Sequence, residues 1–285
     1  MTDDSTKEIL TQWNKECSLE PYGVIVGCSC SQEWLLPWWW MHFQMHNSEY
    51  PVTFFDFGDM TQLGKNWCSK RGRLETLPKN SIGRFIAPRQ NIPSRHVVFW
   101  ESHKNLNVWE ARVSWFQKPF ACLHSPYKKT LWIDLDCQVR KSIAPLFVFC
   151  DTPYEVAMVE EPAYIMKLHR DVGELLEQEI EYNAGVIAFN HGANLIQSWA
   201  RKCLECNQTL RGDQEVFSRL LFEKGIKILP IPPSYVERSS YSPITLVISQ
   251  VGESNIIVHW AGSHKQLIRI SIELFKTSAL MDFSL

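Results

Sequence analysis

The chain has 285 residues and a formal net charge of −2, with 45% hydrophobic and 21% charged residues. This length can bury a substantial core, and the composition is ordinary for a globular enzyme. The small net charge excludes a global field that would recruit nucleic acid, so we expect no nucleic-acid partner.

The N-terminal residues 1–20 predict a short amphipathic helical extension, with apolar residues on one side and charged residues on the other. The polar, acidic start lacks the basic and apolar regions of a secretory signal. Nine cysteines are scattered without the spacing of a disulfide scaffold. The most apolar window, residues 34–43, is too short to span a bilayer. We therefore expect no transmembrane helix and a reducing, cytoplasmic setting.

Strand and helix patterns alternate along residues 21–285, which predicts a single large α/β domain with a doubly wound sheet. We find no internal repeat and no low-complexity linker. In chain order, we expect strands at residues 23–27, 52–57, 97–100, 130–133, 154–159, 184–189 and 255–260, with a further apolar run at 226–231. We expect helices at residues 34–46, 109–116, 195–204 and 213–224.

Two charged stretches interrupt this alternation. Residues 65–95 carry eight basic residues against one acid, Glu75, and we interpret them as a solvated loop or irregular insertion. The alternative is a basic rim that attracts a diphosphate or an anionic acceptor. Residues 160–181 are predominantly acidic and compatible with a helix, so we expect them to form a solvated face.

The stretch Thr130–Val139, TLWIDLDCQV, is an apolar run that ends in Asp134 and Asp136. Residues two apart on an extended segment point to the same side, so these carboxylates would converge at the tip of a buried strand. In parallel α/β sheets, ligands bind beyond the carboxyl ends of the strands. The pair therefore predicts a divalent-cation site, and the alternative is that it caps a turn.

A second group of polar residues follows an apolar run near the C-terminus, in the segment IIVHWAGSHK. His259, Gly262 and Lys265 stand there at the spacing H-x-x-G-x-x-K. An imidazole can complete the coordination of a metal such as Mn²⁺. A glycine lets the backbone approach a phosphate, and a lysine adds a point charge. Together with the two aspartates, these residues predict a site for a metal-bound diphosphate.

Other motifs are weaker or absent. Cys203 and Cys206 form a C-x-x-C pair inside an amphipathic helix pattern, which favours core packing over zinc or redox chemistry. There is no G-x-S-x-G, Walker or G-x-G-x-x-G loop. A phosphatase of the HAD type is disfavoured because Gln138 stands where its motif needs threonine or valine.

Four motifs in order resemble those of glycosyltransferase family 8, the glycogenin and lipopolysaccharide-galactosyltransferase group. Lys118 and Tyr127 precede the D-x-D, and an Asn-Ala-Gly-Val run begins at Asn183. An Asp-Gln pair at Asp213 opens a predicted helix, and H-x-x-G-x-x-K closes the set. The resemblance covers residues 23–265. It implies the GT-A fold, a Rossmann-like mixed, mostly parallel sheet flanked by helices.

The resemblance also implies a role for each motif residue. Asp134, Asp136 and His259 would hold Mn²⁺, with Mg²⁺ as the alternative cofactor. Lys265 and the Gly262 backbone would contact the donor diphosphate.

The remaining motif residues would position the donor sugar or its phosphates. Lys118, Asn183 and Asp134 would bind the donor, Asp213 would orient sugar hydroxyls, and Gln214 would lie near the anomeric carbon. The family's acidic residue and tyrosine after the first strand are replaced here by CSCSQEW, in which Trp34 could stack on the nucleotide base.

The implied reaction is transfer of a hexose from a nucleotide diphosphate sugar, expected to be a UDP-sugar, to a hydroxyl of an acceptor sugar or protein. The family retains anomeric configuration, and the leaving phosphate itself would take the acceptor proton. The alternative is a catalytically silent sugar-nucleotide-binding or scaffold protein on the same fold.

Overall fold

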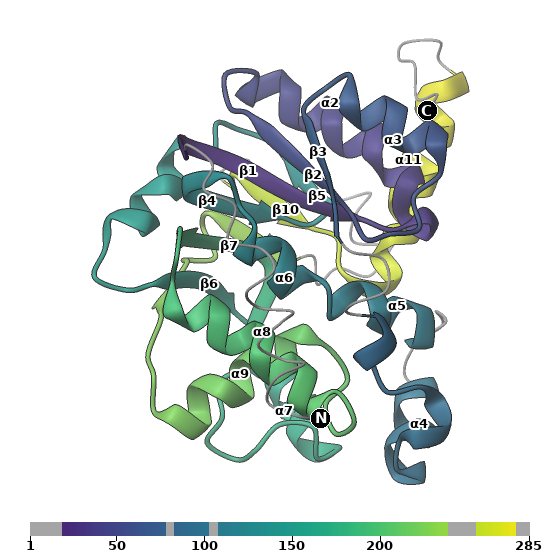
Figure 1. Ribbon diagram of the computed structural model, residues 1–285, viewed down its shortest axis with the longest axis vertical. Coiled ribbons are helices and arrows are strands. Elements are labelled where there is room, and N and C mark those ends of the chain that lie inside the picture. The colour runs from purple at the N-terminus through teal and green to yellow at the C-terminus, as the bar shows by residue number, and fades with distance from the viewer. Residues whose placement is uncertain (1–18, 78–82, 103–107, 239–254, 278–285) are drawn as a thin grey trace.

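The computed structural model describes residues 19–77, 83–102, 108–238 and 255–277. These residues form a seven-stranded sheet of strand order β3-β2-β1-β4-β7-β6-β8 and a three-stranded sheet of order β5-β10-β9. Helices lie on both faces of the larger sheet (Figure 1). Nearly all of the predicted N-terminal extension lies outside the described residues, and the prediction of a single domain remains a prediction.

The strands follow the predicted alternation closely. They are β1 (Glu20–Cys28), β2 (Val52–Asp56), β3 (Arg73–Thr76), β4 (Tyr127–Ile133), β5 (Cys137–Val139), β6 (Val156–Glu160), β7 (Tyr182–Asn190), β8 (Leu229–Pro230), β9 (Val236–Arg238) and β10 (Ile257–His259). The expected strands at 23–27, 52–57, 154–159, 184–189 and 255–260 are thus confirmed.

The α-helices are α2 (Leu36–Asn47), α3 (Gln62–Ser69), α4 (Ser94–Ser102), α5 (Val108–Trp115), α6 (Lys118–Leu123), α7 (Ala163–Asp171), α8 (Asn194–Cys206), α9 (Asp213–Lys224) and α11 (Lys265–Thr277). Short 3₁₀ segments include η1 (Cys30–Leu35) and η5 (Gly262–His264). The four helices expected from apolar spacing are confirmed. No helix in the described ranges is long and apolar enough to cross a membrane.

Alternate residues of the central strands pack on opposite faces of the larger sheet. Leu131 and Ile133 of β4 join the cluster that contains apolar residues of α2, α3 and α11, whereas Trp132 joins the cluster under α6, α8 and α9. Strand β4 pairs parallel with β1 and antiparallel with β7. The sheet is therefore mixed and mostly parallel, as expected, and it is buried on both faces.

The smaller sheet begins directly after the central strand. β5 follows β4 after a short turn and pairs antiparallel with β10, with His259 opposite Cys137. β10 pairs parallel with β9 on its other side. The D-x-D segment therefore lies where the chain passes from the larger sheet to the smaller one.

One expectation about the elements is wrong, and two hold only in part. Residues 97–100 belong to α4 and not to a strand, because Pro93 precedes the helix start and Val97 and Trp100 are buried at helical spacing. Residues 65–95 are not wholly irregular, since residues 65–69 end α3 and residues 73–76 form the edge strand β3. Residues 160–181 form a solvated face only in part, because three of their glutamates, Glu161, Glu179 and Glu181, are buried.

Candidate functional site

The two aspartates of the D-x-D lie in a tight turn between the two sheets. The Cys137 amide donates to the Asp134 carbonyl at 2.9 Å, and the Asp134 amide donates to the Gly185 carbonyl at 2.8 Å. The expectation that the carboxylates converge from an extended strand tip is therefore wrong, because Asp134 and Asp136 stand in the turn that follows β4. The turn directs the carboxylates to two different lysines.

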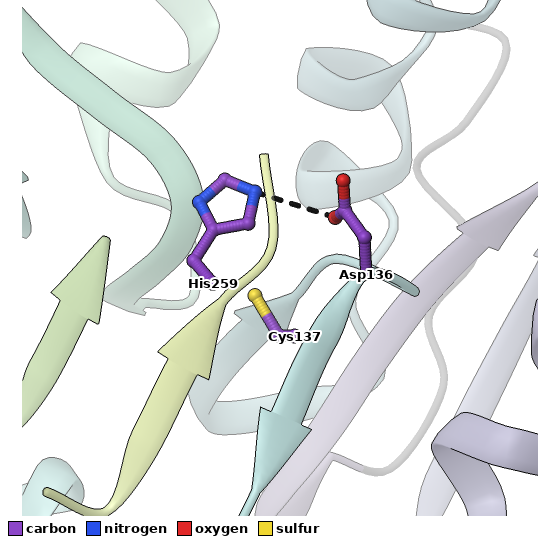
Figure 2. A group of neighbouring side chains, drawn as sticks. All are labelled: Asp136, Cys137 and His259. Carbon is purple, nitrogen blue, oxygen red and sulfur yellow. Dashed lines mark ion pairs between the residues drawn. The ribbon is translucent and has the colours of Figure 1, made fainter. Parts of the chain in front are cut away.

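Asp136 is buried between a lysine and a histidine. Figure 2 shows its contact with the histidine. One carboxylate oxygen lies 2.9 Å from the Lys265 Nζ, and the other lies 3.3 Å from the His259 Nε2. Burial alone would raise the pKa of Asp136, but Lys265 and His259 together lower it well below its usual range. Asp136 therefore presents a negative charge at the end of β10.

The other ring nitrogen of His259 faces an amide oxygen. The Asn183 Oδ1 accepts from the Gly185 amide at 2.9 Å and lies 2.9 Å from the His259 Nδ1. Because an amide oxygen only accepts, this contact requires a proton on Nδ1. The Nε2 then points toward Asp136 and is the ring nitrogen that a cation on that side would meet.

Asp134 belongs to a second charged cluster. Lys118, at the start of α6, lies 3.1 Å from Asp134 and 3.5 Å from Asp213, and donates to the Ala184 carbonyl at 2.9 Å. Burial alone would lower the pKa of Lys118, but the two aspartates raise it. Burial raises the pKa of Asp213 to about 6, although Lys118 opposes the shift. The indole of Trp132 donates to Asp134 at 2.7 Å.

Gln214 follows Asp213 in the first turn of α9, and all the polar atoms of its amide are bonded. Its Oε1 accepts from the Ala184 amide at 3.2 Å. Its Nε2 donates to Glu161 at 3.0 Å and to Glu181 at 2.9 Å. The sequence pattern did not identify these two glutamates, because they stand in the acidic stretch that we expected to be solvated.

Gly262 precedes α11, and Trp34 contacts a residue of the same helix. Gly262 opens η5 with a φ of +66°, and a Cβ there would have no neighbour within 4 Å. Glycine is therefore favoured for its backbone conformation, which lets Lys265 follow at the start of α11. The guanidinium of Arg269, on α11, lies 4.6 Å from the centre of the Trp34 ring. One face of this ring is thus covered, and its stacking on a base remains a prediction.

The residues present fit a divalent cation in part. In the described part of the chain, Asp136, Cys137 and His259 form the group of three candidate ligands whose atoms lie within 4.8 Å of one another (Figure 2). Neighbouring ligands of an octahedral cation stand about 3 Å apart, close to the observed carboxylate–imidazole separation. An oxygen and an imidazole suit Mn²⁺, whereas burial raises the pKa of the Cys137 thiol and disfavours it as a ligand. Asp134, the third expected ligand, instead contacts Lys118.

Residues 120–266 match the sequence profile of Glycosyl transferase family 8. This region is more than half of the chain and contains the D-x-D turn, the Asn183 and Asp213 motifs and the H-x-x-G-x-x-K segment. The chain belongs to glycosyltransferase family 8. Two predicted donor-binding residues of this family 8 chain, Trp34 and Lys118, lie before the matched region. A search among proteins of curated function found no match.

Solved structures share the fold of this family 8 chain. The galactosyltransferase LgtC, in complex with donor and acceptor sugar analogs, is 11% identical with a TM-score of 0.55, over 88% of this chain and 95% of LgtC. GlyE of Streptococcus pneumoniae TIGR4 is 14% identical with a TM-score of 0.53, over 92% of this chain and 62% of GlyE. The bifunctional WbbM is 11% identical with a TM-score of 0.57, over 88% of this chain. The chain spans about half the length of WbbM, 47%. These similarities show that the fold is GT-A.

Proposed function

We propose that this chain is a metal-dependent glycosyltransferase that moves a hexose from a nucleotide diphosphate sugar, a UDP-sugar, to a hydroxyl acceptor with retention of configuration. The observation that carries the proposal is the pair of charged clusters at the sheet junction. Asp136 lies between His259 and Lys265, and Lys118 lies between two further carboxylates. Family membership supports the reaction class, and the charges suit a diphosphate.

Each cluster has a distinct task in this proposal. Asp136 and His259 would hold Mn²⁺, or Mg²⁺ as the alternative, and Asp134 would join them on release from Lys118. The bound cation would neutralise charge that develops on the leaving diphosphate. The ammonium groups of Lys265 and Lys118 would add electrostatic stabilisation to the phosphate oxygens, with the Gly262 backbone close to them.

The donor sugar would lie on the α9 side of the site. Asn183 and the ionised Asp213 would contact its hydroxyls, and Gln214 would face the anomeric carbon. The acceptor is a sugar or protein hydroxyl, and its proton would pass to the leaving phosphate. The eight described cysteines have free thiols, which supports a reducing, cytoplasmic setting.

A catalytically silent sugar-nucleotide-binding or scaffold protein is the second candidate. The observation that favours it is the position of Arg269 over Trp34, which covers one face of the ring expected to receive the base. Such a protein would bind a nucleotide sugar without cleaving it.

The test is Mn²⁺-dependent cleavage of a panel of nucleotide sugars by the purified protein. We expect one UDP-sugar to be hydrolysed, and Asp136→Ala to lower the rate at least about 100-fold because the cation and Lys265 lose their shared carboxylate. Asp151→Ala is the matched control, since Asp151 is an exposed carboxylate paired with Lys129. Binding without cleavage would favour the silent protein, and equal loss in both variants would contradict the proposed site.

A further inference from the structure

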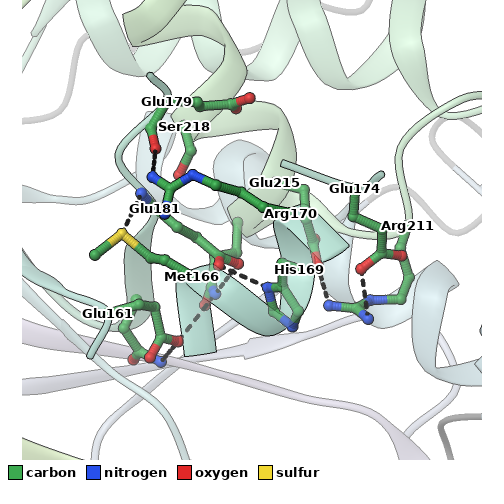
Figure 3. Close-up of polar contacts among 12 residues, drawn as sticks. Glu161, Met166, His169, Arg170, Glu174, Glu179, Glu181, Arg211, Glu215 and Ser218 are labelled. Carbon is green, nitrogen blue, oxygen red and sulfur yellow. Dashed lines mark hydrogen bonds and ion pairs between the residues drawn. The ribbon is translucent and has the colours of Figure 1, made fainter. Parts of the chain in front are cut away.

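The buried Glu161 lies outside the family's motifs and contacts two motif residues, Asn183 and Gln214. Glu161 directly follows β6, and its side chain has no exposed area. Its amide donates to the Glu181 carbonyl at 2.8 Å, which fixes the backbone. Figure 3 shows the side chain among the polar contacts that join β6, α7 and α9.

Both carboxylate oxygens of Glu161 are occupied by donors. The Oε1 accepts from the Asn183 Nδ2 at 2.8 Å and from the Gln214 Nε2 at 3.0 Å. The Oε2 accepts from the Arg238 Nη1, on β9, at 2.6 Å. One carboxylate therefore links the amide that contacts His259 with the amide predicted to face the anomeric carbon.

These contacts decide which way the Asn183 amide points. Its NH₂ faces a carboxylate, which only accepts, and its oxygen faces the Gly185 N–H, which only donates. The oxygen therefore also faces the His259 Nδ1 and holds a proton there. If the amide turned over, its NH₂ would face Nδ1, and Nδ1 could not keep a proton. The ring proton would then sit on Nε2, 3.3 Å from Asp136, where it would oppose binding of a cation.

We propose that Glu161 is a positioning residue for glycosyl transfer, which fixes the amides of Asn183 and Gln214 and, through Asn183, holds the His259 ring with a proton on Nδ1 and with Nε2 toward Asp136. The inference rests on the proposed function where it concerns the cation. The orientation of the imidazole in the metal-free protein does not depend on that function.

The critical variant is Glu161→Gln, which keeps the size of the side chain. A glutamine amide must turn its NH₂ either toward Arg238 or toward Asn183 and Gln214, and each choice sets donors against donors. We expect the Asn183 amide to lose its single orientation, because the Gly185 N–H is then the one contact left to hold its oxygen. The ¹⁵N-histidine spectrum of the metal-free protein should then show a lower proton occupancy of the His259 Nδ1, with the signal assigned by a His259→Asn sample.

Cation binding supplies the second measurement. Loss of a group that orients a metal-binding histidine weakens metal binding about 10- to 100-fold. We expect this increase in the Mn²⁺ dissociation constant of Glu161→Gln, measured by electron paramagnetic resonance without nucleotide, and a lower kcat with little change in the KM for the donor.

The matched control is Glu179→Gln. Glu179 is also fully buried and is also paired with one arginine, Arg219, but it contacts neither the Asn183 amide nor the Gln214 amide. The Glu179→Gln variant should leave the His259 tautomer and the Mn²⁺ affinity unchanged. Glu161→Asp is a second variant for the case in which Glu161→Gln does not fold. It keeps the charge beside Arg238 but withdraws the oxygen from the two amides, so Mn²⁺ affinity should fall about tenfold.

Two results would overturn the inference: an unchanged His259 tautomer in folded Glu161→Gln, or an equal shift in Glu179→Gln. Wild-type Mn²⁺ affinity in Glu161→Asp would overturn it as well. If the wild-type protein binds no Mn²⁺ and cleaves no nucleotide sugar, the proposed function fails, and the spectra still decide whether Glu161 sets the tautomer.

Discussion

At the scale of single residues, the site depends on a glycine, which leaves room for the His259 ring. Gly185 lies in β7 beside His259, and a Cβ built on it would stand 2.3 Å from the His259 Cε1 and 2.4 Å from the Nδ1. It would also stand 2.9 Å from the Asn183 Oδ1. The imidazole and the amide that orients it therefore occupy the space that any other residue would need.

We expect Gly185→Ala to displace the His259 ring, because the β7 backbone is buried and paired on both sides. The Mn²⁺ dissociation constant should rise at least about tenfold, measured by electron paramagnetic resonance. The control is Gly83→Ala, where a Cβ meets its nearest atom at 3.7 Å. Unchanged Mn²⁺ binding in a folded Gly185→Ala variant would show that His259 is not the nitrogen ligand.

The motif residues could be identified from the sequence, but the residues that hold them could not. His259 reaches Asp136, and Lys265, which was expected on a phosphate, is paired with the same carboxylate. Glu161 was missed because its partners Gln214 and Arg238 are 53 and 77 residues away in sequence. A carboxylate in an acidic stretch is ordinarily solvated, and only the fold shows that this one is buried and paired.

At the scale of elements, Arg112 holds the segment before α9 in place. Arg112, on α5, is fully buried, and its guanidinium donates to the carbonyls of Leu210 at 3.0 Å and Arg211 at 2.8 Å, and to that of Asn207. It also lies 4.4 Å from the centre of the Trp100 ring. Burial lowers the pKa of Arg112 to about 10, so it remains charged at neutral pH. The start of α9, which carries two site residues, is thereby fixed.

We expect Arg112→Met to lower the free energy of unfolding by about 2–4 kcal/mol, because three buried carbonyls lose charged donors. Urea denaturation would measure this loss. The matched control is Arg71→Met, in which an exposed guanidinium 3.8 Å from the Trp67 ring is removed, and the change should stay within about 0.5 kcal/mol. Equal effects of the two substitutions would contradict the role of Arg112.

The elements that sequence reasoning misjudged share a physical cause. Val97 and Trp100 suit a strand by propensity, yet their packing with Val108 and Ile92 in a small separate cluster selects a helix. Strand β7 runs antiparallel between β4 and β6, and a strand buried along almost its whole length does not reveal its direction. Local pattern located most elements correctly, while tertiary packing decided type and direction where propensity was ambiguous.

At the scale of the whole molecule, the candidate metal ligands come from two sheets. Asp136 lies in the turn between β4 of the larger sheet and β5 of the smaller one, and His259 ends β10 of the smaller sheet. Lys265 joins them from α11, whose Ile268 and Ile272 pack in the same apolar cluster as β10. A cation at this point would connect the C-terminal part of the described chain to its central strand.

A cation bound there should stabilise the fold as a whole, because the unfolded chain does not bring Asp136 and His259 together. At a Mn²⁺ concentration 100 times the dissociation constant, the linkage contributes about 2.7 kcal/mol. For a chain of this size we expect the Tm to rise by about 5–10 °C, measured by thermal unfolding with and without Mn²⁺, and to fall again on addition of a chelator. His259→Ala should abolish the rise, whereas Asp151→Ala should preserve it. A rise that persists in His259→Ala would place the cation elsewhere on the molecule.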